Sequence, residues 1–585
     1  MRESKHVLRF KLKFLALAFC LVPFAISLPC AQAVSCDLVH HAPPTDADKA
    51  LLAGEYEKAA SLYRADLPQH PANAAMTTGL VHALLRQQKV EEAADVVKAA
   101  LAMIQDSPPL LTLQGEVQYR QGLPWEAEKS LAQSYKIDPC NPRTRLLSAR
   151  LSRLSSRYAS AREQILMAHK LDPADPEISS QWIRTLPLQQ QIAENEAYLA
   201  SAPSEDADNL KSIREHIDRL KKQASETQKA CHLVSPVSST EIPLVTFMSD
   251  ATHPSGVGLD VKLNDKSAGM EIDTGAGGIV ITRPIAERAG LKPLAKTSIG
   301  GIGDEGPQSS YEAYADSIKV GKLEFRDCIV EVVNSNHLFK RDNRGFLDQS
   351  GGGPEGLIGM DVFSHFLITL DYPSRKLSLN QLPVRPGEEA SAEAQSLNTS
   401  ASTPSESQSA PDTPKAGAQS SKAANTGPFD RYIAPEMKDY TPVYRYGHFL
   451  MLPTSLNDKS RKLFVMDTGA YSTIISPTAA REVTKLQRED SGAQGLSGTV
   501  KKSYLADEIT LTFANLREKA RDVDSFDTSG ISRNAGIEIS GFIGATTLQL
   551  LTIHIDYRDG LIKFDYDPKN APGYRDHPYG PASWY

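Results

Sequence analysis

The chain has 585 residues, too many for a single hydrophobic core, and at roughly 150 residues per domain it can form about four units. Its 64 basic and 71 acidic residues give a formal net charge of −7 at pH 7. No long basic run occurs after the first residues, so the composition lacks the electrostatic signature of nucleic-acid binding. We therefore expect no nucleic-acid partner.

Residues 1–33 have the pattern of a secretory signal peptide. Basic residues up to Lys13 precede an apolar run at 14–28, and the small residues Ala31 and Ala33 follow it. The run is short and Pro23 breaks it, so no transmembrane span is expected once the signal is removed. This predicts an exported protein, periplasmic or secreted; an uncleaved anchor or a lipoprotein attached through Cys36 is a less favoured alternative.

The cysteines and histidines do not form a metal-ligand pattern. After removal of the signal peptide, the chain keeps four widely separated cysteines, Cys36, Cys140, Cys231 and Cys328. No CxxC or Cys/His cluster occurs, so we expect no zinc site, no other metal site and no cofactor. Export would allow the cysteines to oxidise, but the sequence does not give their pairing. The following histidines lack ligand spacing and are expected at the surface or in packing: His337, His365, His448 and His554.

Residues 46–226 contain a repeat. Ala59, Ala93, Ala127 and Ala161 follow one another at a constant interval of about 34 residues. Such a period predicts stacked pairs of helices, in which each alanine lets the second helix of a pair approach the first closely. The segment resembles the tetratricopeptide repeat, and this resemblance implies a docking surface for a substrate or a protein partner. A spacer or a lid is the alternative role.

Strand-like sequence follows in two regions, 240–384 and 429–570. Between them, residues 385–428 are rich in Ser, Ala, Thr, Pro and Gly, which predicts a disordered linker. A flexible linker of about 44 residues spans on the order of 35 Å, which permits the two regions to pair within one chain but does not enforce it.

The two regions are copies of one another. Leu-Asn-Asp-Lys-Ser begins at Leu263 and again at Leu456, and each copy leads into Asp-Thr-Gly-Ala, at Asp273 and at Asp467. Further on, GLIG ends at Gly359 and GFIG ends at Gly544. The duplicated part of the chain therefore carries the acidic motif.

This context resembles the aspartic peptidases, both the retropepsins and the pepsins. The resemblance rests on the two DTGA motifs, on LIG and FIG, and on the glycine-rich segments 298–306 and 491–498, which occupy the place of the family's flap hairpins. It implies a multidomain fold: an N-terminal all-α helical-repeat solenoid followed by two mainly-β retropepsin-like lobes. It also implies catalytic residues Asp273 and Asp467, supported by Thr274, Gly275, Thr468 and Gly469, with flap candidates Gly300, Gly301, Gly303, Gly495 and Gly498.

The residue types suit this chemistry. Two carboxyl groups a few Å apart cannot both ionise easily, so they share a proton. One can then act as a general base on water while the other acts as a general acid on the peptide carbonyl. We therefore expect an aspartic endopeptidase; the alternative is a non-catalytic peptide-binding or assembly protein that uses the same lobes.

Overall fold

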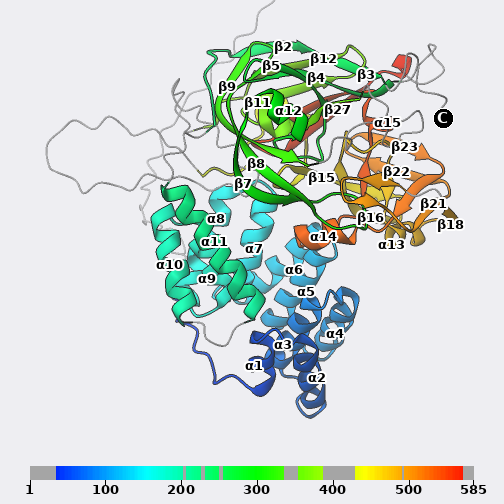
Figure 1. The fold of residues 1–585 in the computed structure, drawn as a ribbon. Coiled ribbons are helices and arrows are strands. Elements are labelled where there is room, and N and C mark those ends of the chain that lie inside the picture. The colour runs from blue at the N-terminus through cyan, green and yellow to red at the C-terminus, as the bar shows by residue number, and fades with distance from the viewer. Residues whose placement is uncertain are drawn as a thin grey trace, which may run out of the picture.

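The computed structural model describes residues 35–201, 206–225, 231–248, 254–334, 353–386, 428–489 and 493–570. The predicted signal peptide and residues 387–427 of the predicted linker lie outside these ranges. Within them, a helical part is followed by two β lobes that sit side by side above it (Figure 1).

The helical part consists of antiparallel pairs. Its helices are α1 (Asp46–Leu52), α2 (Tyr56–Asp66), α3 (Ala74–Arg86), α4 (Val90–Met103), α5 (Pro108–Arg120), α6 (Pro124–Ile137), α7 (Pro142–Leu154), α8 (Tyr158–Leu171), α9 (Pro176–Ile183), α10 (Leu188–Ser201) and α11 (Ala207–Ser225). The repeat alanines at positions 59, 93, 127 and 161 are all buried, which confirms the close packing expected of them.

A left-handed turn joins the two helices within each of the first four pairs. The turn residues Gly54, Gln88, Gly122 and Ser156 all have positive φ, and they recur with the same period as the alanines. Glycine adopts this conformation without strain, whereas Gln and Ser adopt it at some cost. The repeat is therefore a repeat of backbone geometry as well as of side-chain packing.

The first lobe is a nine-stranded sheet in the order β1-β9-β6-β10-β5-β4-β8-β7, with β3 paired to β4. Its elements are β1 (His232–Leu233), β3 (Val245–Met248), β4 (Pro254–Leu263), β5 (Lys266–Ile272), β6 (Ile279–Thr282), α12 (Arg283–Arg288), β7 (Lys292–Ile299), β8 (Gln308–Val320), β9 (Leu323–Val333) and β10 (Gly356–Ile358). Strand β1 pairs with β9 and therefore belongs to this lobe, although it lies before the predicted start of the region at residue 240.

The second lobe repeats this plan in a ten-stranded sheet, β18-β21-β24-β17-β25-β16-β15-β22-β23, with β14 paired to β15. Its elements are β14 (Tyr444–Tyr446), β15 (Phe449–Leu456), β16 (Ser460–Met466), β17 (Ile474–Ile475), α13 (Pro477–Arg481), β18 (Leu486–Glu489), β21 (Ser503–Ala506), β22 (Ile509–Phe513), β23 (Leu516–Ala520), β24 (Val523–Phe526), α14 (Ser529–Ala535), β25 (Gly541–Ile543) and α15 (Ala545–Leu548). A separate two-stranded piece pairs β19 (Gln494–Gly495) with β20 (Gly498–Thr499).

The duplicated motif folds in the same way in both lobes. Asn264 and Asp265 form a tight turn with positive φ between β4 and β5, and Asn457 and Asp458 do so between β15 and β16. Two consecutive residues with positive φ match a type I′ hairpin turn, which explains the Asn-Asp pair. The internal duplication read from the sequence is therefore also a duplication of structure.

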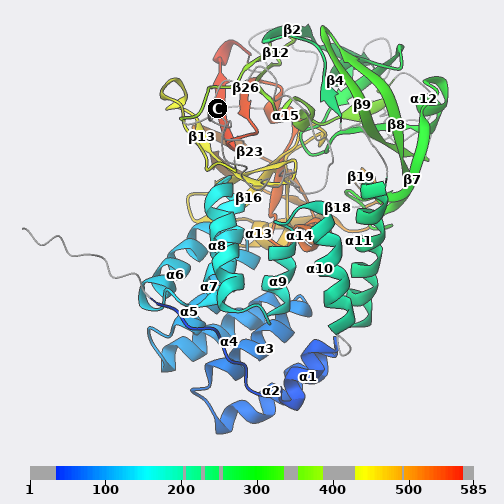
Figure 2. The ribbon, with the colours of Figure 1, turned by 90° about the vertical axis from the view of Figure 1, so that its left-hand side faces the viewer.

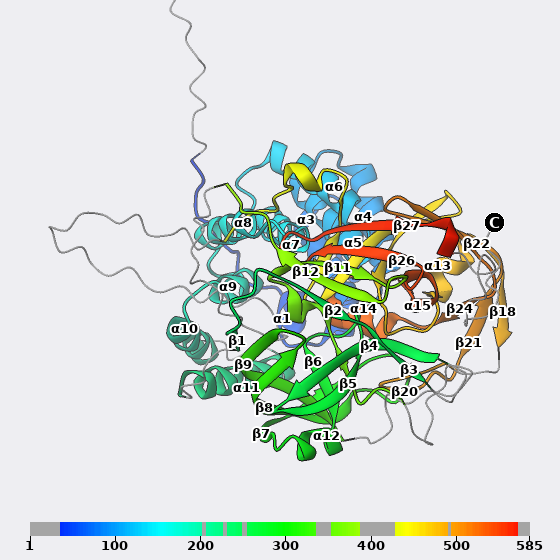
Figure 3. The same ribbon diagram turned by 90° about the horizontal axis from the view of Figure 1, so that it is seen from above.

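A third sheet joins the lobes. It has six strands in the order β13-β27-β26-β11-β12-β2, in which β11 and β26 pair antiparallel at the centre (Figure 3). Its strands are β2 (Ser239–Pro243), β11 (Phe366–Asp371), β12 (Lys376–Gln381), β13 (Thr441–Pro442), β26 (Leu551–Asp556) and β27 (Leu561–Tyr566). Arg385, placed in the predicted linker, is instead buried and forms an ion pair of 2.6 Å with Asp559.

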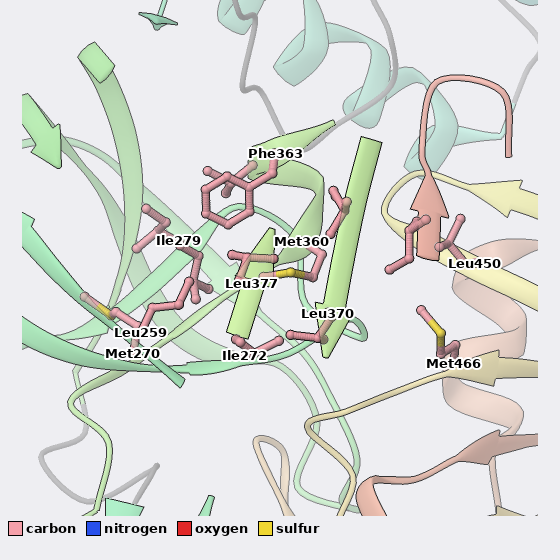
Figure 4. Packing of buried hydrophobic residues seen from close by; sticks show 14 of the residues in the cluster. Leu259, Met270, Ile272, Ile279, Met360, Phe363, Leu370, Leu377, Leu450 and Met466 are labelled. Atoms are coloured by element: carbon pink, nitrogen blue, oxygen red, sulfur yellow. The ribbon is translucent and has the colours of Figure 1, made fainter. Parts of the chain in front are cut away.

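One hydrophobic core continues from the first lobe into the second. It contains Met270 and Met360 from the first lobe and Leu450 and Met466 from the second (Figure 4). The lobes therefore share buried apolar surface as well as a sheet, and burial of that surface favours their pairing within one chain.

The helical part packs against the second lobe. The Arg461 guanidinium lies 4.5 Å from the ring centroid of Trp125, and the Glu538 N–H donates to the Arg120 carbonyl at 3.0 Å. Gly122 passes so close that a Cβ there would lie 2.5 Å from the carbonyl oxygen of Glu538. Leu154 belongs to a buried cluster that otherwise consists of second-lobe residues, so removal of the helices would expose apolar surface on that lobe.

Two disulfides close long loops. Cys36 is bonded to Cys140, and Cys231 is bonded to Cys328. The second bond fixes β1 to β9 and has a sequence separation of 97 residues. Closing a loop of this length lowers the entropy of the unfolded chain, which stabilises the fold.

We expect the double substitution Cys231→Ser/Cys328→Ser to lower the free energy of unfolding by about 2–4 kcal/mol. Urea unfolding of the variant against the parent protein measures this. Alkylation of the native parent without reductant should label neither cysteine, and labelling of either one would contradict the bond.

Among the helices within the described residues, none combines the length and the apolar character needed to cross a membrane.

Candidate active site

Asp273 and Asp467 occupy equivalent places in the two lobes. Asp273 directly follows strand β5, and Asp467 directly follows strand β16. The backbone N–H of Asp273 donates to the carbonyl of Ile358 in the LIG element at 3.0 Å, and that of Asp467 donates to the carbonyl of Ile543 in the FIG element at 3.0 Å. Strands β10 and β25 run parallel to β5 and β16, so the LIG and FIG elements hold the aspartate-bearing strands from one side.

The two carboxyl groups face one another. A Cβ added to Gly275 would lie 2.6 Å from the carboxyl carbon of Asp467, and one added to Gly469 would lie 2.4 Å from that of Asp273. Each glycine also donates its N–H to the aspartate of its own lobe, at 2.8 Å to Asp273 and at 2.9 Å to Asp467. Any side chain at Gly275 or Gly469 would therefore collide with the aspartate of the opposite lobe, which explains why both positions are glycine.

The threonines of the motifs bond across the lobes. The Thr274 N–H donates to the Thr468 hydroxyl at 3.0 Å, and the Thr468 N–H donates to the Thr274 hydroxyl at 3.0 Å. Each hydroxyl in turn donates to a carbonyl of the other lobe, Met466 at 2.8 Å and Ile272 at 2.9 Å. Both threonines are buried, so this set of four hydrogen bonds fixes the distance between the aspartates.

Burial and the facing carboxyl group change the acidity of the pair. Burial, followed by the charge of Asp467, raises the pKa of Asp273 to about 7, and a hydrogen bond with Asp467 contributes to this rise. The hydrogen bond from the Gly275 N–H and the charge of His448 oppose it. The pair therefore holds one proton between its two carboxyl groups up to near-neutral pH.

The tips of the glycine-rich segments meet. The Gly301 N–H donates to the Ser497 hydroxyl at 3.0 Å, the Ser497 N–H donates to the Ile302 carbonyl at 2.9 Å, and the Glu305 N–H donates to the Ser497 carbonyl at 2.9 Å. A Cβ on Gly303 would lie 2.3 Å from Ser497, and one on Gly495 would lie 2.4 Å from the Ile302 carbonyl oxygen.

The flap tips also exchange apolar side chains. Ile302 of the first segment packs against a buried cluster of the second lobe, whereas Leu496 of the second segment packs against a buried cluster of the first lobe. The two tips are therefore interlocked by both hydrogen bonds and packing.

The predicted site residues fall into two groups. The aspartates, threonines and glycines of the two DTG motifs lie together, whereas the flap glycines lie in the two glycine-rich segments, where Gly498 (φ +86°) approaches Glu305. Gly300 has only Pro307 near the position of a Cβ, at 4.0 Å. Residues 491 and 492 of the second segment lie outside the described residues.

His448 belongs to this site, contrary to the expectation of a surface or packing role. Its Nε2 lies 3.1 Å from the Gly275 carbonyl oxygen, and a Cβ on Gly277 would lie 2.7 Å from its Nδ1. It stands in the turn between β14 and β15, which reaches across to the first lobe. Sequence spacing does not show this contact, because it crosses from one lobe to the other; Ser497 was missed for the same reason.

Comparison with known proteins agrees with this architecture. Residues 259–362 match the aspartyl protease family, and residues 50–117 match the tetratricopeptide repeat. Similar solved structures include a thermophilic TPR protein of Thermus thermophilus, with 19% identity, coverage of 29% of this chain and 92% of that chain, and a TM-score of 0.25. A retropepsin-like aspartic protease from Rickettsia conorii has 19% identity, coverage of 25% of this chain and 94% of that chain, and a TM-score of 0.17. No curated protein matches the chain.

The chain therefore combines a tetratricopeptide-repeat region with an aspartyl protease region. The predicted fold class, a helical-repeat part followed by mainly-β protease lobes, is confirmed. Repeats of this kind indicate a protein-interaction region.

Proposed function

We propose that the protein is an exported aspartic endopeptidase that hydrolyses peptide bonds with a water molecule activated by Asp273 and Asp467. The observation that carries this proposal is the pair of facing carboxyl groups, held by the cross-lobe threonine hydrogen bonds. Export is supported by the two disulfides, because disulfides form and persist in oxidising compartments.

Because the pair shares one proton, it contains one general base and one general acid. The ionised carboxylate takes a proton from water, and the resulting hydroxide adds to the scissile carbonyl while the protonated carboxyl group donates to its oxygen. As the C–N bond breaks, the carboxyl group that took the proton from water gives it to the amine nitrogen, and the other carboxylate takes a proton from a hydroxyl group of the intermediate, which restores the starting pair. The interlocked flap tips support this chemistry, because a closed cover excludes bulk water from the reacting groups.

The pKa of Asp273, raised to about 7, sets the alkaline limit of activity. We expect activity to fall as pH rises through about 7, because the pair then loses its shared proton and with it the general acid. At low pH, protonation of both carboxyl groups removes the general base. A bell-shaped profile of kcat/KM with its maximum on the acidic side of 7 is the expected result.

His448 should shift that alkaline limb. Burial raises the pKa of both Asp273 and Asp361, and the charge of His448 opposes this rise at both carboxyl groups. We therefore expect His448→Phe to raise the pKa of Asp273 and to move the alkaline limb of kcat/KM to higher pH. His554→Phe is the matched control, since His554 contacts Thr369 and Asp565 in the joining sheet. Equal profiles for both variants would contradict the assignment of His448.

A non-catalytic peptide-binding protein is the competing function, because the same lobes could hold a peptide without cleaving it. Incubation of the purified mature protein with a mixed peptide library, followed by mass spectrometry of new termini, separates the two. Cleavage by the parent protein and none by Asp467→Asn supports the peptidase. Binding without new termini at any pH from acidic to mildly alkaline would support the alternative.

A further inference from the structure

A line of charged residues follows the repeat on one face of the helical part. His82, Glu116, Arg150 and Arg184 occupy the same position in successive repeats and stand on α3, on α5, on α7 and at the end of α9. Helices α3, α5, α7 and α9 are the first helices of successive pairs (Figure 2), so these four residues recur from one repeat to the next. The Nε2 of His82 lies 3.2 Å from a carboxylate oxygen of Glu116.

Further arginines, Arg86, Arg120 and Arg153, lie one helical turn beyond three residues of this line. We call Arg86, Arg120, Arg150, Arg153 and Arg184 the arginine face. Burial lowers the pKa of Arg120; the charge of Glu116 opposes this, and the like charges of Arg150 and Arg86 lower the pKa further. Desolvation also lowers the pKa of Arg184, and the like charges of Arg153 and Arg150 add to this. The charges of Arg86 and Arg150 therefore act on Arg120, and those of Arg150 and Arg153 act on Arg184, while Arg86 and Arg184 are exposed to solvent.

The carboxylates beside the arginine face are already engaged. Glu116 is paired with His82, and Glu177 is held by both Arg143 and Arg150. Asp175 is paired with Arg143 at 2.9 Å. Across the part of the chain that the structure describes, Arg153 and Arg184 have no carboxylate at ion-pair distance, whereas the charge of Arg86 acts on Asp206. The uncompensated positive charge of this face therefore lies at Arg153 and Arg184.

Helix α11 borders the arginine face. Its first turn is fixed to the first repeat, where Asp206 accepts a hydrogen bond from the Tyr56 hydroxyl at 2.8 Å. Further along it, burial and then the charges of Arg219 and Arg184 lower the pKa of His216. Near its other end, the Lys222 ammonium donates to the Leu294 carbonyl on β7, which leads to the first flap.

The arginine face ends beside the candidate active site. Helix α7, which carries Arg150 and Arg153, packs against strand β14 of the second lobe. Tyr446 is the last residue of β14, and His448 follows it in the same turn and reaches the Gly275 carbonyl beside the aspartates. A single turn therefore connects the arginine face to the cleavage site.

We propose that the arginine face binds an acidic segment of a protein substrate and so presents the adjoining segment to the cleft. Guanidinium groups form strong, geometrically matched hydrogen bonds with carboxylates, and the unpaired arginines are distributed over successive repeats rather than concentrated at one point. An extended chain with several Asp or Glu side chains fits this distribution. The flanking Glu116 and Glu177 and the net charge of −7 disfavour a nucleic acid. Presentation of a substrate for cleavage rests on the proposed peptidase function, whereas binding of the acidic segment can be tested without it.

The binding test uses the full mature chain carrying Asp467→Asn, so that no probe is cleaved. Fluorescence anisotropy is measured with a labelled decapeptide of alternating Glu and Ser, and with the same peptide carrying Lys in place of Glu. We expect the acidic peptide to bind, and Arg153→Glu/Arg184→Glu to weaken it at least about tenfold. The matched control Lys98→Glu/Lys170→Glu makes the same charge change on exposed residues of α4 and α8 and should leave the affinity unchanged.

A second variant guards against misfolding. Arg153→Gln/Arg184→Gln removes the charges without introducing new ones, and it should weaken the acidic peptide in the same direction with unchanged circular dichroism. Equal binding of the acidic and basic peptides, or equal loss in the lysine control, would overturn the proposal. Tighter binding of a single-stranded oligonucleotide than of the acidic peptide would overturn it as well.

A cleavage test separates this proposal from the proposed function. With the dyad intact, the arginine double variant should cleave a short neutral peptide at the parental rate but lose about tenfold in kcat/KM on a protein that carries an acidic tail. If the acidic peptide binds as expected and nothing is cleaved, the peptidase function fails while the docking proposal stands. If cleavage occurs without any effect of the arginines, the docking proposal fails alone.

Discussion

Asp467→Asn should abolish peptide hydrolysis, with a loss of kcat on the order of 10³-fold or more. The amide keeps the shape of the side chain and can still accept from Gly469, but it cannot share a titratable proton with Asp273. Asp273→Asn should do the same, because neither carboxyl group works without the other. The double variant should be hardly worse than either single variant, since the two residues act as a unit. Retained activity in Asp467→Asn would contradict the intramolecular pair.

The same substitutions should not destabilise the protein at neutral pH. A carboxyl group whose pKa in the fold is raised to about 7 binds its proton more tightly when folded than when unfolded. Its contribution to stability is therefore complete below its ordinary pKa of 3.8 and is lost as pH rises through about 7. An asparagine removes this loss, so the inactive Asp273→Asn variant should melt no lower than the parent just above neutral pH. Calorimetry then separates loss of chemistry from loss of fold.

Thr468→Val should give the second largest effect. Valine matches threonine in shape but lacks the hydroxyl, so the Thr274 N–H loses its acceptor and the Ile272 carbonyl loses its donor. Each buried group left unsatisfied costs about 1–3 kcal/mol. The aspartates also lose the contacts that fix their separation, and misplacement of catalytic groups by about 1 Å can cost about 10²-fold in rate. We expect a lower melting temperature together with lower kcat/KM.

Thr468→Ser is the matched control, because serine retains the hydroxyl and loses only a methyl group. It should restore most of the activity and of the stability relative to Thr468→Val. If serine and valine were equally impaired, the methyl packing rather than the cross-lobe hydrogen bonds would explain the effect. Thr274→Val and Thr274→Ser should behave in the same way, since Thr274 makes the equivalent bonds to Met466 and Thr468.

The features predicted from sequence are those that the chain repeats. The alanine period identified the helix pairs, and the two DTGA motifs with their LIG and FIG elements identified the lobes and the residues that the fold brings together. Such a pattern can be recognised in a duplicated sequence, because the same local geometry requires the same residues twice. The Asn-Asp turns at 264 and 457 show this directly.

The features that could not be predicted are contacts that depend on how separate elements are placed against one another. His448 reaches Gly275 across the lobes, Ser497 bonds to Gly301 across the flaps, and the arginine face comes from single residues in separate repeats. Each depends on how whole elements are placed, and no local pattern encodes that placement. Likewise, the cysteine pairing follows from the adjacency of β1 and β9, which only the folded chain shows.

The interlocked flap tips limit the shape of what can enter. Ser497 bonds to both Gly301 and Ile302, so lifting one tip means breaking its bonds to the other. A compact domain cannot pass beneath a cover of this kind, whereas a single extended strand can slide in once the tips part briefly. Natively folded proteins should therefore resist attack except at loose loops and tails, and prior unfolding of a target should accelerate its degradation.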